Sequence, residues 1–186
     1  MPFQQTNIPG LLVFEPKVFE DSRGHFFESY NEQLFKQQGI DHRFVQDNQS
    51  SSVYGVIRGL HYQLLPHAQS KLVRVLKGKI LDVVVDIRKG SPSFGKTFCI
   101  ELSAKNKKQL FIPAGLAHGF SIQSKKAEVL YKSDNFYNPE SEAGIIYNDS
   151  MLGIDWNIPH GEEIVSDKDL RLPDFASCKN NFVFEG

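Results

Sequence analysis

Short runs of Val, Ile, Leu and aromatic residues recur along the chain, and each run is bounded by Gly, Pro, Asn, Asp or Ser. Runs of this length between turn residues are typical of β-strands. The predicted strands cover residues 11–19, 25–30, 56–63, 71–76, 80–87, 97–102, 109–112 and 128–132. Residues 71–76 alternate most clearly, since Leu72 and Leu76 share one face with Arg74 while Val73 and Val75 share the other with Lys71.

One helix is predicted at residues 32–38, with Asn31 as its N-cap and Gly39 just beyond its end. The stretch after Pro159 has weak periodicity, which predicts loops and a short helical turn. Many short strands with one or two short helices predict an all-β barrel or sandwich of the jelly-roll kind. A second subunit often covers the open sheet edges of such a fold. Without repeats or linkers, residues 1–186 are expected to form a single domain, in loops or extended after about residue 173.

Composition narrows the class of protein. The 186 residues are 40% hydrophobic and 23% charged, which is typical of a compact globular domain. The formal net charge of -1 argues against nucleic-acid binding as the main activity, although a small anion needs only a local basic cluster. The start of the chain does not resemble a signal peptide, and no apolar run approaches the ~18 residues that span a bilayer. We therefore expect a cytoplasmic protein with no membrane partner.

Three clusters contain residues that could carry chemistry. Strand alternation at residues 58–63 predicts that His61 faces away from Arg58, at a position accessible to a ligand. His118, between small residues in a predicted turn, would suit close approach of a phosphate, and Tyr131 lies in an apolar strand. Each residue alone also fits an ordinary structural role, as a hydrogen-bonded histidine or a core tyrosine. No second ligand stands at short spacing from His61 or His118, so a metal site is not indicated.

Taken together, the segments resemble the dTDP-4-dehydrorhamnose 3,5-epimerase family. The resemblance runs in order from about residue 9 to residue 173. The matching segments are residues 19–30, 44–48, 58–63, 71–74, 84–88 and 112–120, then Tyr131-Lys132, residues 137–139 with Glu142, and Trp156 ahead of Lys168-Asp169. One such motif would be weak support, whereas this ordered series is specific.

The resemblance implies a cupin-like jelly roll without metal or cofactor, assembled as a homodimer through exchanged strands. It implies epimerisation of dTDP-4-dehydro-6-deoxy-D-glucose at C3 and C5, on the route to dTDP-L-rhamnose. His61 resembles the general base, Asp169 its carboxylate partner, Tyr131 the general acid and Lys71 the cation beside the C4 oxygen. Tyr137 matches the aromatic residue that stacks on thymine. The remaining positions implied to contact substrate are Arg23, Glu28, Gln46, Asp47, Asn48, Arg58, His118, Glu142 and Lys168.

Epimerisation beside a ketone requires a base and an acid, and His61 and Tyr131 suit these roles. A ketone at C4 acidifies the hydrogens at C3 and C5, so neither a nicotinamide nor a metal is required. His61 can act as base near neutral pH, because the pKa of an unperturbed histidine is ~6.5. A tyrosine stays protonated and can donate to the enolate carbon, and a nearby cation would lower its pKa and ease that transfer.

The sequence alone leaves other functions open. The nearest alternatives are an epimerase acting at C3 only and a 3,4-ketoisomerase on the same sugar nucleotide. A cupin-like binding or sensory module would bind dTDP without proton exchange. A metal-dependent cupin oxygenase or isomerase is the third alternative, which metal analysis would test.

Overall fold

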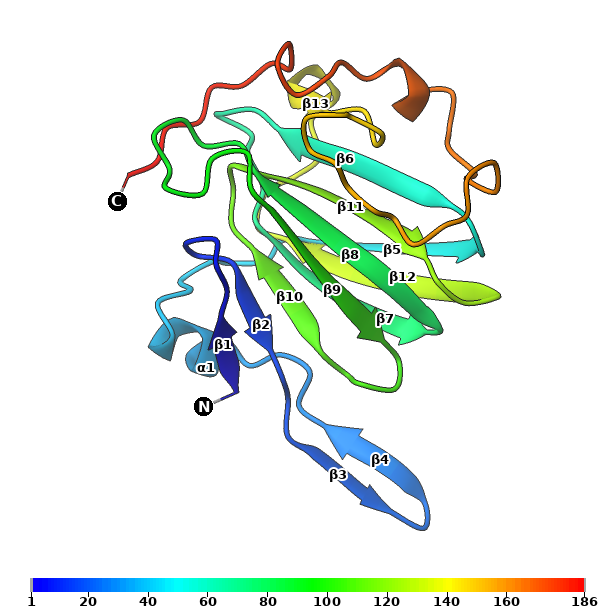
Figure 1. Cartoon of the computed structure of the whole chain (residues 1–186). Helices are drawn as coiled ribbons and strands as arrows, with labels where there is room; N and C mark the ends of the chain where they lie inside the picture. The colour runs from blue at the N-terminus through cyan, green and yellow to red at the C-terminus, as the bar shows by residue number, and fades with distance from the viewer. Residues whose placement is uncertain (1, 186) are drawn as a thin grey trace.

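Strands dominate the computed structural model, which describes residues 2–185 (Figure 1). The strands are β1 (Phe3–Gln5), β2 (Leu12–Phe14), β3 (Val18–Asp21), β4 (Gly24–Phe27), β5 (Gln46–Val53), β6 (Ile57–Gln63), β7 (Lys71–Lys77), β8 (Lys79–Asp86), β9 (Thr97–Ser103), β10 (Gln109–Ile112), β11 (Leu116–Ile122), β12 (Lys126–Ser133) and β13 (Glu142–Gly144). The helices are α1 (Glu32–Gln37) and the 3₁₀ helices η1 (Pro139–Ser141) and η2 (Asp169–Arg171). The predicted all-β class is confirmed. No helix within residues 2–185 is long and apolar enough to cross a membrane.

Two antiparallel sheets form the body of the molecule. The six-stranded sheet has the order β1-β2-β10-β7-β12-β5, and the five-stranded sheet has the order β13-β6-β11-β8-β9. Val73 and Val75 of β7 meet Val84 of β8 and Phe120 of β11 in a buried core between the sheets. The alternation predicted for residues 71–76 is confirmed, because Leu72 packs on the opposite face with Phe111. Burial of such side chains in both layers is the main stabilising contribution.

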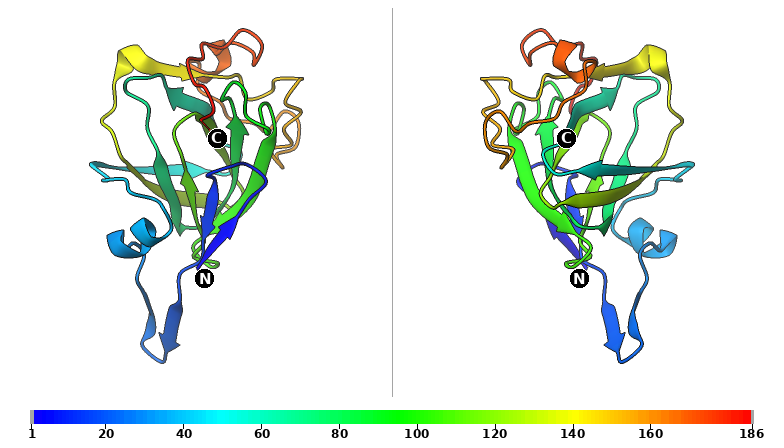
Figure 2. Two further views of the ribbon diagram at one scale, coloured as in Figure 1. Left: turned by 90° about the vertical axis from the view of Figure 1, so that its left-hand side faces the viewer. Right: turned by 90° about the vertical axis from the view of Figure 1, so that its right-hand side faces the viewer.

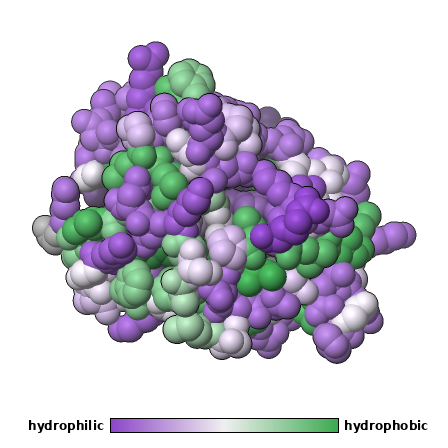
Figure 3. All heavy atoms as spheres, turned by 90° about the horizontal axis from the view of Figure 1, so that it is seen from above, coloured by the Kyte–Doolittle hydropathy of each residue, from purple (hydrophilic) through white to green (hydrophobic). Residues whose placement is uncertain are grey.

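The outer faces of the sheets are covered by different segments. Helix α1 lies over part of the six-stranded sheet, where Phe35 packs against Phe14 and Leu72. The helix begins as predicted, since the side chain of Asn31 accepts hydrogen bonds from the first turn. The long C-terminal segment covers the five-stranded sheet through Trp156. Seen from above, the surface at this end is mostly hydrophilic, with hydrophobic side chains in separate groups (Figure 3).

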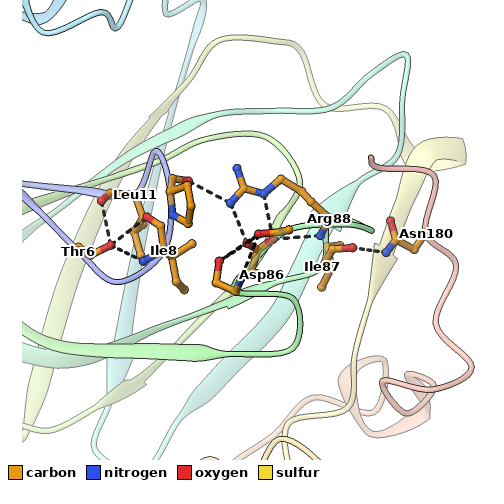
Figure 4. A network of polar contacts seen from close by, with 10 residues as sticks. Thr6, Ile8, Leu11, Asp86, Ile87, Arg88 and Asn180 are labelled. Atoms are coloured by element: carbon orange, nitrogen blue, oxygen red, sulfur yellow. Dashed lines mark hydrogen bonds and ion pairs between the residues drawn. The ribbon is translucent and has the colours of Figure 1, made fainter. Parts of the chain in front are cut away.

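A buried polar network fastens both ends of the chain to β8 (Figure 4). The carboxylate of Asp86 accepts hydrogen bonds from Arg88 and from two serine hydroxyls of the following turn. Arg88 also donates to the carbonyl of Pro9 at 3.0 Å. On the other side, the side-chain amide of Asn180 donates to the carbonyl of Ile87. The network therefore holds the N-terminal loop and the C-terminal segment against the same strand.

The hairpin β3–β4 projects away from the two sheets (Figures 1 and 2). The sequence predicts one strand over residues 11–19, whereas the structure has β2 and β3 with Pro16 between them. Proline lacks the N–H that continued pairing requires. Phe19 and Phe26 lie opposite each other in the hairpin, and their side chains are 55% and 73% exposed. The hairpin thus carries apolar surface that its own chain leaves uncovered.

Candidate active site

Two cavities of about 520 and 210 Å³ open between the sheets and share the lining residues His61, Lys71 and Tyr131. His61 lies on β6 of the five-stranded sheet, whereas Lys71 and Tyr131 lie on β7 and β12 of the six-stranded sheet. The imidazole therefore faces the shared space from one wall, and the amine and the phenol face it from the other.

A β-bulge in β6 brings Arg58 to the same cavity as His61. In the pairing with β11, His61 stands opposite His118 and Arg58 opposite Phe120, so β6 uses one more residue than β11. The prediction that Arg58 and His61 face opposite ways is wrong for this reason, since both line the larger cavity. Gly59 lies within the bulge, where a Cβ would come 2.5 Å from the Cα of the neighbouring Gly119.

His61 and Asp169 form a hydrogen-bonded pair, with Nε2 2.8 Å from Oδ1. The segment ending in η2 delivers Asp169 to β6, although the two residues are far apart in sequence. Burial raises the pKa of Asp169, but the hydrogen bond from His61 and other donors outweigh it, so the pKa lies below its usual range. An ionised Asp169 holds the imidazole through Nε2 and so fixes its orientation.

Lys71 and Tyr131 are adjacent on the opposite wall, where the Lys71 ammonium lies 5.7 Å from the centre of the Tyr131 ring. Burial lowers the pKa of Lys71 to about 8, and the negative charges of Asp82 and Glu142 counter part of this effect. Burial raises the pKa of Tyr131, and the positive charge of Arg58 only partly offsets it. A cation does act on Tyr131, as expected, but burial is the stronger influence and keeps the phenol protonated.

His118 lies in the middle of β11 and not in a turn as predicted. The segment 112–120 turns at Pro113 and Gly115 and then continues as a strand. His118 is almost fully buried, and Asp82 of β8 accepts from its Nε2 at 3.0 Å. The imidazole still lines the larger cavity, so its Nδ1 is the nitrogen left for a ligand.

The smaller cavity is lined by side chains from β5 and from the segment after β12, among them Gln46, Asn48, Tyr137 and Glu142. Glu142 accepts hydrogen bonds of 2.6 Å from the Tyr137 hydroxyl and from the Lys168 ammonium. Burial raises the pKa of Glu142, but these two hydrogen bonds outweigh it and hold the pKa below its ordinary value. The structure therefore joins Tyr137, Glu142 and Lys168 in one charged group beside the cavity.

Three of the predicted substrate contacts lie outside both cavities. Asp47 pairs with Lys132 at 3.0 Å, because strand alternation turns it away from Gln46 and Asn48. Arg23 pairs with Asp21 at the tip of the projecting hairpin, and Glu28 follows the last residue of that hairpin.

Three side chains beside the site have no place in the sequence-based prediction. Asp82 accepts a hydrogen bond from His118, and its negative charge raises the pKa of Lys71. The hydroxyl of Ser52 accepts from the Arg58 guanidinium at 3.1 Å. Gln63 bridges two loops beside Tyr137. Asp82 could be found as a charge in an otherwise apolar strand, and Gln63 ends the matching segment 58–63, whereas Ser52 has no such signal. Within residues 2–185, no three His, Cys, Asp or Glu side chains are grouped as a metal site.

Comparisons with known proteins agree with this arrangement. A sequence model of the dTDP-4-dehydrorhamnose 3,5-epimerase family matches residues 5–177. The dTDP-4-dehydrorhamnose 3,5-epimerase of Shigella flexneri is 53% identical over 175 residues, which cover 94% of this chain and 96% of that protein.

Solved structures of 3,5-epimerases share the fold. The epimerase of Elizabethkingia anophelis superposes with a TM-score of 0.90 and 50% identity, covering 94% of this chain and 96% of that chain. The Legionella pneumophila dTDP-6-deoxy-D-glucose-3,5-epimerase, in complex with dTDP-4-keto-L-rhamnose, has a TM-score of 0.89 and 46% identity over 94% of this chain and 93% of that one. The expected cupin-like jelly roll is confirmed. The chain belongs to the dTDP-4-dehydrorhamnose 3,5-epimerase family.

Proposed function

We propose that this protein epimerises dTDP-4-dehydro-6-deoxy-D-glucose at C3 and C5 and yields dTDP-4-dehydro-L-rhamnose, in the biosynthesis of dTDP-L-rhamnose. The observation that carries the proposal is the placement of His61 on one wall of the cavity and of Lys71 and Tyr131 on the other. Inversion at carbon requires that a proton leave one face of the sugar and return to the opposite face, which two walls with different groups allow.

The first step is proton removal. His61 takes the proton from C3, and the electron pair of the C–H bond forms the enolate with its charge on the C4 oxygen. Asp169, held at 2.8 Å, stabilises the imidazolium that results. Lys71 donates to the enolate oxygen, and a well-placed donor of this kind contributes about 2.7–4 kcal/mol to transition-state stabilisation.

The second step is proton return. Tyr131 gives its proton to the opposite face of C3, the C4 carbonyl re-forms, and the configuration at C3 is inverted. Exchange with solvent then removes the proton from His61 and restores the one on Tyr131, so the same pair repeats the reaction at C5. No hydride or electron is transferred, so the overall reaction is an isomerisation.

The remaining polar groups bind the nucleotide. Arg58 and His118 line the larger cavity, and we assign them to the diphosphate and the sugar. Tyr137, Gln46 and Asn48 line the smaller cavity, where the Tyr137 ring stacks on the thymine. Lys168, which lines the larger cavity, donates to Glu142, which lines the smaller one. A local cationic site of this kind explains how a chain with a net charge of -1 binds an anion.

A homodimer accounts for two of the three groups that lie outside the cavities, Arg23 and Glu28. The hairpin β3–β4 projects from its own chain with two exposed phenylalanines. Arg23 lies at its tip, and Glu28 directly follows its second strand. In the proposed dimer these two side chains complete the cavity of the partner. Asp47 acts within its own chain, where its pair with Lys132 holds β5, the strand of Gln46 and Asn48, beside the smaller cavity. The enzyme is proposed to act in the cytoplasm, where nucleotide sugars are made.

The test is to incubate the purified protein with dTDP-4-dehydro-6-deoxy-D-glucose and determine the configuration of the product by NMR. The expected product has inverted C3 and C5. dTDP-glucose, which lacks the C4 ketone, is the matched control and should remain unchanged. Recovery of unaltered ketosugar from protein that binds dTDP would refute the proposed reaction.

A further inference from the structure

We infer that Gln63 is a positioning residue for Tyr137 and thereby for the nucleobase; this inference rests on the proposed function of Tyr137. Gln63 is the last residue of β6, and its side chain is almost fully buried, with 4% exposed. A buried primary amide costs stability unless its hydrogen-bonding groups are satisfied. The partners of this amide therefore show what it holds in place.

All the partners of Gln63 are backbone groups of two loops. Its Nε2 donates to the carbonyl of His67 at 2.6 Å and to the carbonyl of Phe136 at 3.2 Å. Its Oε1 accepts from the backbone N–H of Asn138 at 2.7 Å. Two of these bonds flank Tyr137 on either side along the chain. One amide thus clamps the peptide groups before and after the residue that we assign to thymine.

Other contacts of the Tyr137 loop show that it needs such a clamp. Tyr137 is 52% exposed and the preceding Phe136 is 65% exposed, so neither ring is anchored by core packing. The backbone N–H of Tyr137 donates to Oε1 of Gln46 at 3.0 Å, and its hydroxyl reaches Glu142. Gln46 and Glu142 both line the cavity and are assigned to substrate. Gln63 supplies two hydrogen bonds to this loop from a buried position.

The placement of Gln63 on β6 gives the clamp a further consequence. His61 and Gln63 are two residues apart on one strand, so their side chains point to the same face. A regular strand fixes their separation at about 6.6 Å along its axis. Because Gln63 holds Tyr137, the same strand sets the distance between the nucleobase site and the general base. A substrate bound at its base end therefore presents its sugar to His61 in a defined register.

The experiment measures the affinity for dTDP by titration calorimetry in the full-length protein. Gln63→Ala should raise the Kd for dTDP about tenfold, toward the effect of losing an aromatic–base stack. Inhibition by inorganic pyrophosphate, which has no base, should be unchanged. Gln63→Met fills the same volume without hydrogen bonds and should give the same result. This variant separates the loss of the hydrogen bonds from the effect of a void left by a smaller side chain.

A double-mutant cycle with Tyr137→Ala tests whether Gln63 acts through Tyr137. The variant with both substitutions should bind dTDP no more weakly than Tyr137→Ala alone, because the clamp then has nothing to position. Effects that multiply would overturn the inference, and so would Gln63 variants that bind dTDP as the wild type does.

The matched control is Gln123→Ala. Gln123 is a half-buried glutamine whose Nε2 likewise donates to two acceptors, the Ser121 hydroxyl and the carbonyl of Trp156. Unlike Gln63, which lines the smaller cavity, it lies outside both cavities. Its loss should lower the melting temperature without changing the Kd for dTDP. An equal loss of affinity in Gln123→Ala would show a general structural effect and would contradict the role of Gln63. Wild-type protein that fails to bind dTDP would instead refute the proposed function itself.

Discussion

Two His–Asp pairs lie side by side in this molecule, since His61 on β6 stands opposite His118 on β11. Their N–O distances are similar, at 2.8 Å for His61–Asp169 and 3.0 Å for His118–Asp82. Their exposure differs, because the side chain of His61 is 31% exposed and that of His118 is 5% exposed. A pair with access to substrate and water can exchange a proton during turnover, whereas a buried pair provides a fixed charge distribution. Exposure of the histidine, and not its pairing with a carboxylate, therefore separates a general base from a structural histidine.

The largest effect is expected at His61, the more exposed of the two histidines. His61→Ala should lower turnover by about 10⁴-fold, at the upper end of the range for positioned acid–base catalysis. The affinity for dTDP should change little, because the imidazole acts on the sugar. Turnover assays and dTDP titrations measure the two quantities. The matched control is His160→Ala, which removes a fully exposed histidine and should retain wild-type turnover. Wild-type turnover by His61→Ala would remove His61 from the mechanism.

The next effect concerns the opposite wall. Tyr131→Phe should lower epimerisation by about 10³-fold, because the ring remains while the proton donor is lost. Since His61 is intact, exchange of the C3 hydrogen with solvent deuterium should continue. Product analysis and NMR of the recovered substrate distinguish inversion from exchange. Unchanged epimerisation by this variant would exclude Tyr131 as the acid.

Asp169→Asn should lower kcat by about 10²-fold, because the amide no longer stabilises the imidazolium formed at His61. Its melting temperature should fall less than that of Asp82→Asn, because the Asp169 carboxylate lines the cavity, although only 6% of its side chain is exposed. A kcat equal to that of the wild type would show that the carboxylate is not required at the exposed pair.

Asp82→Asn changes the buried pair. Removing a buried carboxylate that is hydrogen-bonded to His118 is expected to lower the free energy of unfolding by about 3 kcal/mol, measured by urea denaturation. Its effect on kcat should be smaller than that of Asp169→Asn. A variant with wild-type stability and a larger loss of kcat would reverse the roles of the two pairs.

The smallest expected change is in pH dependence. Lys71, with a pKa of about 8, loses its positive charge as the pH rises through that value, so kcat/KM should fall on the alkaline side. An arginine keeps its charge at higher pH, so in Lys71→Arg the decrease in kcat/KM should occur at higher pH, even if the activity at neutral pH is lower. The profiles are measured from pH 6 to about pH 10, where the profile of Lys71→Arg should stay level. Identical alkaline limbs in both proteins would show that Lys71 does not control this ionisation.

The strands that sequence reasoning found are those with apolar runs. The prediction of residues 109–112 coincides with β10, and that of residues 56–63 is close to β6. Strand β5 was missed because its residues, from Gln46 to Val53, are mostly polar and its edge position requires no apolar run. Strand β11 was missed because the small residues around His118 indicate a turn, whereas packing between two neighbouring strands decides its structure.

Only part of the site is predictable from the sequence, because some of its contacts depend on how the strands pair. His61, Lys71 and Tyr131 belong to segments with clear motifs, and the structure brings them to one cavity. The β6 bulge that turns Arg58 to the same side depends on pairing with β11, which single-strand alternation does not contain. Asp82 and Gln63 act through partners distant in sequence, so their roles emerge only from the folded contacts.

The most direct test of two opposed walls is to run the wild-type reaction in D₂O and follow deuterium at C3 and C5 by NMR. Deuterium is expected at both carbons, with both configurations inverted, because one base and one opposed acid serve both positions. Deuterium at C3 alone would identify a single epimerase, and no deuterium at either carbon, from protein that binds dTDP, would contradict the proposed roles of His61 and Tyr131.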